Sequence, residues 1–329
     1  MNKNLEEISM KDTWKLKLRL WGVMVLMFGM VYVLIMLVTS LLGYSGSFSL
    51  YAIMGLLVIF LQYIFSPKIV EWSMHVKPLS KEEAPHIHEI VEELAMKANI
   101  PKPKIGISGI DIPNAFAYGR SQRSGHVCIT NSLLGLLDRD ELKAVLGHEI
   151  GHIKHNDMAI TTIVSAIPMV CYYLALSTMF SRSNDNNSAW FIIGVLAFVA
   201  YLLGQLLVLF VSRIREYYAD EASVEFGSRP HNLASALYKL SYGASRVSEQ
   251  KIKDVEGTRA LFLNDVNDAQ NNIRSFKQLD SNNDGTISAD ELDRLKYTEI
   301  RVKGKDNLKE LLSTHPDMLK RVKRLSKLA

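Results

Sequence analysis

The chain has 329 residues, of which 48% are hydrophobic and 22% are charged. With a mean hydropathy of +0.07, this hydrophobic share is high for a purely soluble protein. The net charge of +4 comes without a basic motif interleaved with aromatic residues, which argues against nucleic-acid recognition. The two cysteines, Cys128 and Cys171, lie in unrelated segments and provide neither a disulfide framework nor a zinc-knuckle spacing.

Four apolar stretches predict four membrane-spanning helices, at residues 18–42, 48–65, 158–180 and 189–211. The third stretch contains several polar residues, so a buried hairpin of a soluble domain is the alternative for the second pair. A signal peptide is excluded for the first stretch because it is too long and lacks a cleavage pattern of small residues.

Positive charge sets the expected orientation. Five lysines and arginines precede or begin the first span, whereas residues 43–47 carry no charge and the loop after the third span has only Arg182 against Asp185. Both connections are therefore expected outside, with the termini in the cytoplasm. The basic stretch at 320–327 fits contact with anionic lipid headgroups or a solvated helix face equally well.

Between the two apolar pairs the pattern changes to that of a mixed soluble fold. Residues 81–99 have apolar positions at helical spacing, and residues 104–110 and 127–130 read as short strands around a polar turn. A strand beside a catalytic cleft can take an extended peptide as an additional strand.

The most informative motif follows at residues 148–152, which read His-Glu-Ile-Gly-His. Residues four apart share one helix face, so His148 and His152 can bind one Zn²⁺ while Glu149 reaches a water on that metal. Asp138 is a suitable N-cap, with acidic residues in the first turn after it. The alternative is a chance match on an amphipathic helix.

A catalytic zinc needs a third protein ligand, and the sequence offers one after the fourth apolar stretch. Glu216 and Asp220 are four residues apart, so Glu216 can complete the coordination while Asp220 accepts the free ring N–H of a ligand histidine. A helix-capping role for this acid pair is the alternative. His155 is a rival third ligand, but a straight helix does not readily bring it to the same ion as His152.

A further motif, residues 280–291, has the register of an EF-hand loop. Gly285 and Ile287 occupy loop positions six and eight, and the oxygen-bearing candidate calcium ligands are Asp280, Asn282, Asp284, Thr286, Ser288 and Glu291. Apolar residues at helical spacing flank the loop. Only three ligands are full carboxylates and no second hand is found, so a polar surface turn is the alternative.

Taken together, the motifs resemble the HtpX-type membrane zinc metalloproteases, relatives of the CAAX prenyl proteases. The resemblance covers nearly the whole chain and is carried by residues 113–119, 148–157, 215–220 and 313–316, with Arg321 beyond them. It implies Zn²⁺ on His148, His152 and Glu216, with Glu149 as base. It also implies that His315 and Arg321 act near the scissile carbonyl, and that a strand from Asn114 through Ala115, Phe116 and Ala117 to Tyr118 lines the cleft.

The predicted fold is mainly α with a small β-sheet, combining a four-helix transmembrane part with a cytoplasmic, gluzincin-like α+β zinc metalloprotease domain. We expect a membrane hairpin at 1–66, the first half of the protease domain at 67–157 and a second hairpin at 158–211. The second half of the protease domain then follows at 212–264, an EF-hand-like insertion at 265–300 and a helical segment completing the domain at 301–329.

The resemblance implies a zinc endopeptidase that cleaves misfolded or damaged membrane proteins, and the charge pattern places its active site on the cytoplasmic side of the plasma membrane. The 280–291 loop adds calcium as an expected second ligand that modulates the enzyme. Two other classes compete with this interpretation. An inactive scaffold that senses calcium would not need Glu149, because the base is not a metal ligand. A transporter would need ionisable groups at mid-depth in the spans, and these are almost absent. The sequence does not set the oligomeric state.

Overall fold

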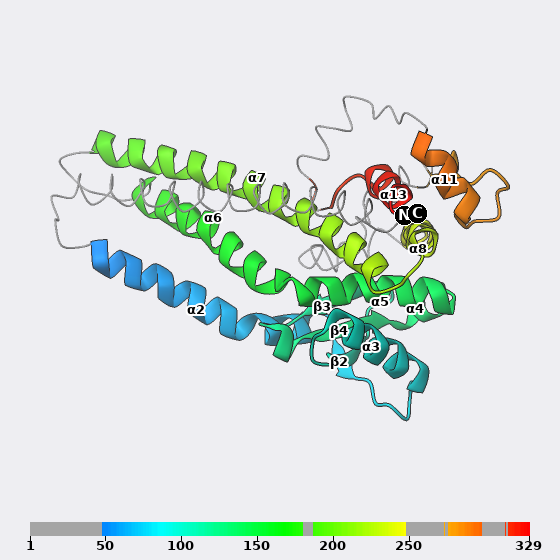
Figure 1. Cartoon of the computed structure of the whole chain (residues 1–329). Coiled ribbons are helices and arrows are strands. Elements are labelled where there is room, and N and C mark those ends of the chain that lie inside the picture. The colour runs from blue at the N-terminus through cyan, green and yellow to red at the C-terminus, as the bar shows by residue number, and fades with distance from the viewer. Residues whose placement is uncertain (1–47, 180–186, 248–272, 274–275, 298–312, 314) are drawn as a thin grey trace. The chain divides into compact units, whose positions relative to one another are not determined.

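The structure is a computed structural model that describes residues 48–179, 187–247, 273, 276–297, 313 and 315–329. It is mainly helical with one small sheet, as predicted (Figure 1). The expected first span at 18–42 lies outside the described residues. The chain divides into two compact units, residues 1–66 with 159–212 and residues 67–158 with 213–329.

In the first unit, the described residues belong to three long helices. These are α2 (Phe48–Ser73), α6 (Asp157–Met179) and α7 (Asn187–Glu225), of which α2 and α7 continue into the second unit. Small side chains allow α6 and α7 to pack closely, among them Cys171, Ala175, Ala197 and Ala200. By length and hydropathy, two helical stretches of the described part qualify as membrane spans, Asp157–Leu176 and Trp190–Glu225.

Two helices extend beyond the apolar stretches that predict the spans. The second apolar stretch ends at Ser66 and Pro67, but α2 continues through Pro67 to Ser73 because a proline removes only one helical hydrogen bond. The fourth apolar stretch ends at residue 211, whereas α7 runs on without a break to Glu225. The residues after Val211 include no proline or glycine before Gly227, so the helix has no reason to stop.

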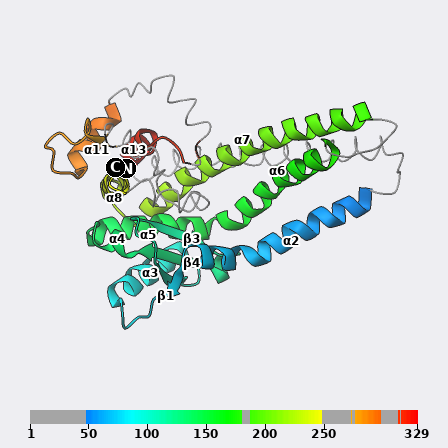
Figure 2. The same ribbon diagram turned by 180° about the vertical axis from the view of Figure 1, so that it is seen from behind.

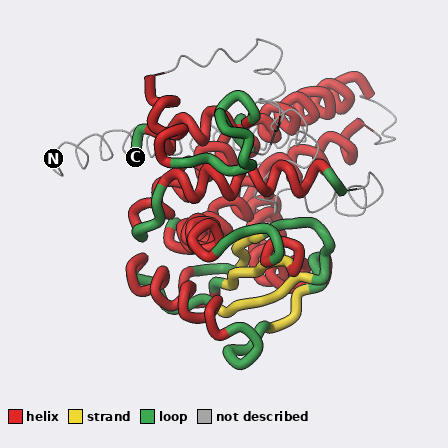
Figure 3. Tube along the Cα trace, turned by 90° about the vertical axis from the view of Figure 1, so that its right-hand side faces the viewer, coloured by secondary structure: helices red, strands yellow, loops and turns green. Residues whose placement is uncertain are grey.

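The second unit contains a four-stranded sheet in the order β1-β2-β4-β3, drawn in yellow in Figure 3. The strands are β1 (Val76–Pro78), β2 (Lys104–Ser108), β3 (Ala115–Tyr118) and β4 (His126–Thr130). β2 and β4 are parallel with Lys104 opposite His126, and β3 is an antiparallel outer strand with Ala115 opposite Ile129. This arrangement leaves one edge of β3 without a neighbouring strand among the described residues.

The helices of the second unit share one hydrophobic core with a face of the sheet. They are α3 (Pro85–Ala98), α4 (Asn131–Leu134), α5 (Arg139–Lys154), α8 (Pro230–Ser245), α11 (Ala289–Tyr297) and α13 (Met318–Ser326), with a 3-10 turn at Gln122–Ser124. α3 and α5 lie beside each other near the sheet in both views (Figures 1 and 2). Alternation along the strands directs Phe116, Tyr118 and Cys128 to a separate cluster with Met74.

Candidate metal centre and active site

Helix α5 carries the histidine motif and has a well-defined start. The Asp138 carboxylate accepts hydrogen bonds from the backbone N–H groups of Asp140 and Glu141, both at 2.9 Å, and the Asp138 N–H donates in turn to the Glu141 carboxylate at 3.0 Å. This reciprocal capping box satisfies N–H groups that the first helical turn leaves without partners. It fixes the beginning of the helix that presents His148 and His152.

Two glycines on α5 allow α7 to approach closely. A Cβ on Gly151 would lie 2.8 Å from the Ala222 Cβ, and one on Gly147 would lie 3.0 Å from the Ser223 Oγ. Ser223 also donates a hydrogen bond to the Ala144 carbonyl at 2.6 Å. Each glycine directly precedes a motif histidine, so the close contact brings the acidic residues of α7 to the histidines.

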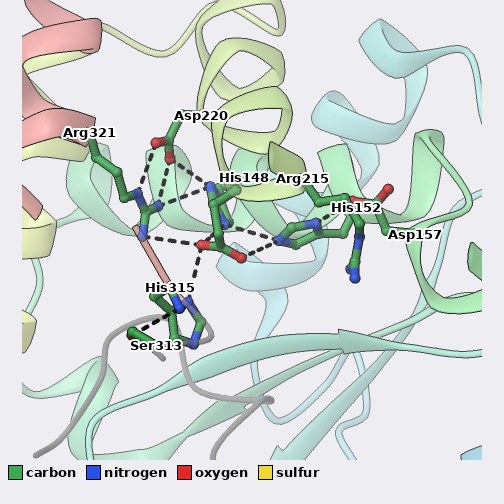
Figure 4. Close-up of polar contacts among 9 residues, drawn as sticks. His148, His152, Asp157, Arg215, Asp220, Ser313, His315 and Arg321 are labelled. Atoms are coloured by element: carbon green, nitrogen blue, oxygen red, sulfur yellow. Dashed lines mark hydrogen bonds and ion pairs between the residues drawn. The ribbon is translucent and has the colours of Figure 1, made fainter. Parts of the chain in front are cut away.

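Each motif histidine is held by an aspartate. The Nδ1 atom of His148 lies 2.9 Å from Asp220 Oδ1, and the Nδ1 atom of His152 lies 2.6 Å from Asp157 Oδ2 (Figure 4). The aspartates take the ring N–H, so the lone pair of each neutral imidazole lies on Nε2. Both Nε2 atoms are then available to one metal ion.

Glu216 completes a group of three possible ligands. Its Oε2 lies 3.7 Å from His148 Nε2 and its Oε1 lies 3.5 Å from His152 Nε2. One ligand atom from each of these three buried residues lies within 4.8 Å of the others. Within the described residues no other such group of histidine, cysteine or acidic side chains is found.

The chemistry of this donor set fits a metal cation. The two Nε2 atoms are only 3.1 Å apart, so two lone pairs face each other beside a carboxylate. A cation between them removes this repulsion and gives the buried Glu216 Oε2, which has an ion pair but no hydrogen-bond partner among the described residues, a direct ligand contact. Burial alone would lower the pKa of His152, but hydrogen bonds to Asp157 and Glu216 raise it to about 10, so the site attracts positive charge.

Arg321, on α13, lies beside the candidate ligand Glu216 and beside Asp220. Its guanidinium is fully buried and donates to both Asp220 oxygens, at 2.9 Å from Nε and 2.6 Å from Nη2, while Nη1 lies 3.2 Å from Glu216 Oε2. Although burial opposes the charge, the two acids raise the pKa of Arg321 above its usual value. The guanidinium therefore supports the carboxylates from the side of α13.

Glu149 lies between the metal ligands and the outer strand. Its side chain is buried and accepts a hydrogen bond from the backbone N–H of Ala117. Burial raises the pKa of Glu149, and the nearby histidines oppose this only in part. Because Ala117 directs its N–H to Glu149 and not to β4, the free edge of β3 faces the site.

The predicted strand residues therefore lie beside Glu149, with different backbone roles. Ala115, Phe116 and Ala117 form β3, whereas Asn114 precedes it. The Asn114 N–H donates to Thr130 Oγ1 at 2.9 Å and its carbonyl accepts from the Thr130 N–H at 3.0 Å, so Asn114 is bonded to the start of α4. On the edge of β3 that faces away from β4 lie the backbone groups of Ala115 and the carbonyl of Ala117, whereas the Ala117 N–H is taken by Glu149.

His315 reaches the site from the segment before α13. Its Nδ1 lies 3.5 Å from Glu216 Oε2, and neither ring nitrogen has a hydrogen-bond partner among the described residues. The His315 N–H donates to Ser313 Oγ at 3.3 Å, and Arg213 donates to the Ser313 carbonyl at 2.9 Å. Arg213 on α7 thereby holds the segment that carries His315.

Two residues of the site were not predicted from the sequence. Asp157, the first residue of α6, binds His152 across the break between α5 and α6, where Asn156 has a left-handed φ of 55°. Arg215 then lies 3.3 Å from Asp157 Oδ2 through its Nε. An asparagine directly before an acid at a helix start was the available signal. The rival ligand His155 is not part of the three-residue group and packs its ring 5.7 Å from that of Tyr218.

The residues proposed for calcium form an ordered loop. Asp280 accepts hydrogen bonds from the N–H groups of Asp284 and Gly285, and Glu291 accepts from Ser281 and Ser288. Thr286 donates to Asp284, and Asn282 does so through its amide. Gly285 has a φ of +81°, as loop position six requires, and Ile287 is buried.

Comparison with known proteins identifies relatives of this chain. Residues 81–329 match Peptidase family M48. A protease HtpX homolog of Methanothermobacter thermautotrophicus is 53% identical over 251 residues, which cover 76% of this chain and 95% of the relative. A protease HtpX homolog of Pyrococcus furiosus is 34% identical over 296 residues, or 88% of this chain and 89% of the relative.

The fold has a counterpart among solved structures. The crystal structure of S. mikatae Ste24p aligns with a TM-score of 0.52 at 18% identity, covering 98% of this chain and 66% of that chain. The resemblance noted in the sequence is thus confirmed at the level of family and of fold, and peptidases of this family use zinc. The chain therefore belongs to peptidase family M48, among its HtpX-type membrane metalloproteases.

Proposed function

We propose that this metalloprotease hydrolyses peptide bonds of misfolded or damaged membrane proteins at one zinc ion held by His148, His152 and Glu216. One observation carries the proposal: two Nε2 atoms, each fixed by an aspartate on Nδ1, lie 3.1 Å apart beside a buried carboxylate. Two imidazoles and one carboxylate are the ligands of a catalytic zinc that keeps an open position.

In this proposal Glu149 is the general base. When bound, zinc supplies a Lewis acid for the scissile carbonyl and lowers the pKa of water. Glu149 takes the proton of the attacking water and passes it to the leaving amine. Its burial, which raises the pKa of the carboxylate, favours such a two-way transfer near neutral pH.

We assign the two remaining candidates different tasks. The Nε2 atom of His315, which has no hydrogen-bond partner among the described residues, suits donation to the oxygen that gains charge in the transition state. Arg321 was expected to act on the same oxygen, but its guanidinium already binds Asp220 and Glu216. These contacts favour a positioning role for Arg321, on the metal ligands.

The free edge of β3 is proposed to hold the substrate as an added strand. The backbone groups of Ala115 and the carbonyl of Ala117 lie on this edge beside Glu149 and do not select a side chain, which suits unfolded substrates of varied sequence. A model peptide N-methylated at the residues that pair with this edge should be cleaved at least about tenfold more slowly. Methylation of the intervening residues serves as the control, and equal losses at both sets would contradict strand addition.

We further propose that four spans cross the plasma membrane, with the termini and the active site in the cytoplasm. The charge difference between the N-terminal segment and the two connections supports this orientation. Tags within residues 43–47 and 184–187 should be labelled on intact cells, and a C-terminal tag only after lysis. A C-terminal tag labelled from outside would place the active site on the other side.

Calcium is proposed to modulate the enzyme through the 280–291 loop. The loop has an EF-hand register, and α11, which begins within it, packs against α13, the helix that carries Arg321 and follows His315. Calorimetry of zinc-loaded wild type and Glu291→Gln tests the binding, because Glu291 is the ligand at position twelve. Equal heats from both would remove calcium from the account.

The central test of function is Glu149→Gln. This substitution removes the base and no metal ligand, so zinc should be retained at one ion per chain while cleavage of an unfolded model substrate falls by several orders of magnitude. An inactive scaffold predicts the same zinc content but no cleavage by the wild type either. Cleavage by Glu149→Gln at the wild-type rate would refute the mechanism.

A further inference from the structure

We propose that Arg215 is a positioning residue for the zinc ligand His152 and acts on it by holding Asp157. The inference rests on the proposed zinc site and extends it to a residue that is not one of the three proposed metal ligands. It makes residues 215–220 of α7 responsible for all three ligands: Glu216 directly, His148 through Asp220, and His152 through Arg215 and Asp157.

The two histidines have matching supports. His148 Nδ1 meets Asp220, whose carboxylate meets Arg321, and His152 Nδ1 meets Asp157, whose Oδ2 lies 3.3 Å from Arg215 Nε (Figure 4). In both cases an aspartate joins a ligand ring to an arginine. The matching order indicates that Arg215 holds the aspartate that orients His152, as Arg321 holds the aspartate that orients His148.

The ion pair between Arg215 and Asp157 is largely buried, so losing the arginine is costly. Asp157 is 2% exposed, and the Arg215 side chain only 13%. A buried carboxylate that loses its cationic partner is costly and reorients towards water or another donor. The Asp157 oxygen would then no longer fix the plane of the His152 ring, which must aim Nε2 at the metal.

Placement on the helices explains why the support comes from α7. Asp157 is the first residue of α6, and Arg215 directly precedes Glu216 on α7. Neither residue belongs to α5, so the ring of His152 is fixed from outside its own helix. Any shift of α7 in the second unit that moves Glu216 also moves the arginine that steadies His152.

Zinc affinity measured by chelator competition tests the proposal without use of activity. Arg215→Gln should weaken zinc binding by about 10- to 100-fold, the usual effect of losing an outer partner of a ligand. When Asp157→Asn is already present, adding Arg215→Gln should change zinc affinity by no more than about twofold, because Arg215 acts through that carboxylate. When Asp220→Asn is present instead, adding Arg215→Gln should still weaken zinc binding as much as it does in the wild type. The cobalt-substituted variant should also have an altered ligand-field spectrum, which a merely structural loss would not cause.

Arg324→Gln is the matched control. Arg324 donates to Glu221 at 2.9 Å, an arginine–carboxylate pair of the same unit that contacts no ligand histidine, so zinc affinity should stay within about twofold. If Arg215→Gln does not fold, Arg215→Lys replaces it with a smaller expected loss. Wild-type zinc affinity in the Arg215 variant would overturn this inference but not the proposed function. The same holds if Arg215→Gln weakens zinc binding equally with and without Asp157→Asn. A wild-type protein that binds no zinc overturns the proposed function as well.

Discussion

Arg321 is the largest fully buried side chain of the described residues, and it compensates two buried carboxylates. Its guanidinium bonds to Asp220 and lies 3.2 Å from Glu216, so both acids depend on it in the absence of metal. An ion pair of this kind contributes little net stability, yet removing one partner leaves uncompensated buried charge.

We therefore predict that Arg321→Ala lowers the free energy of unfolding of the zinc-free protein by about 3–5 kcal/mol. Arg324→Ala, which breaks a partly exposed pair with Glu221, should cost no more than about 1 kcal/mol. Thermal and denaturant unfolding of both variants in the same detergent measures the difference. Equal costs would mean that Arg321 is not the counter-charge of the site.

At the scale of residues, sequence spacing predicts which side chains share one helix face, but it does not predict contacts made across the break between two helices. His148, His152 and the pair Glu216 and Asp220 follow from the four-residue spacing of a helix face. Asp157 lies five residues after His152 and reaches it across the break between α5 and α6, where Asn156 takes a left-handed conformation. Periodicity contains no information on such a turn, so Asp157 and its partner Arg215 were not identified.

At the scale of elements, the site depends on how closely α5 and α7 approach. The Cα of Ala219 lies 3.2 Å from where a Cβ on Gly151 would be, and the Ala222 Cβ lies nearer still, at 2.8 Å. Neither neighbour can move without moving the helix that carries Glu216. The two helices therefore have to separate if this glycine gains a side chain.

We predict that Gly151→Ala destabilises the protein by about 1–3 kcal/mol through overpacking and weakens zinc binding, because the ligand on α7 is displaced from those on α5. Gly135→Ala is the control, since a Cβ there would meet its nearest neighbour, the Ser132 carbonyl, at 3.9 Å. Unfolding and chelator competition check both effects. Unchanged zinc affinity in a destabilised Gly151→Ala would show that helix separation does not control the metal site.

Only some element boundaries were predicted closely. The helix expected at 81–99 is α3, which starts later, at Pro85, with a proline in its first turn, and ends as expected before Asn99 in the left-handed region. The strand expected at 104–110 is β2, which already ends at Ser108, and the strand expected at 127–130 is β4, which begins one residue earlier at His126, because strand ends depend on partners far along the chain. β1, three residues long with a proline, has too little pattern to be recognised.

At the scale of the whole molecule, the 280–291 loop and the residues beside it are not an appendage. Phe276, Ile287 and Leu292 belong to the same hydrophobic core as residues of α5, α8 and α13. The Phe276 ring stacks on Tyr238 of α8 at 5.0 Å. Sequence patterns identify the loop register but not this sharing of the core, because long-range packing leaves no periodic signal.

The central claim is that one zinc ion is bound by two imidazoles and one carboxylate, and X-ray absorption at the zinc edge of the purified protein tests it most directly. We predict one zinc per chain with only nitrogen and oxygen neighbours at about 2.0–2.2 Å, and two of these should have the multiple-scattering pattern of imidazole. Glu149→Gln should retain this zinc site, whereas His152→Ala should lose the metal. A sulfur neighbour, a single imidazole or a protein without zinc would contradict the account.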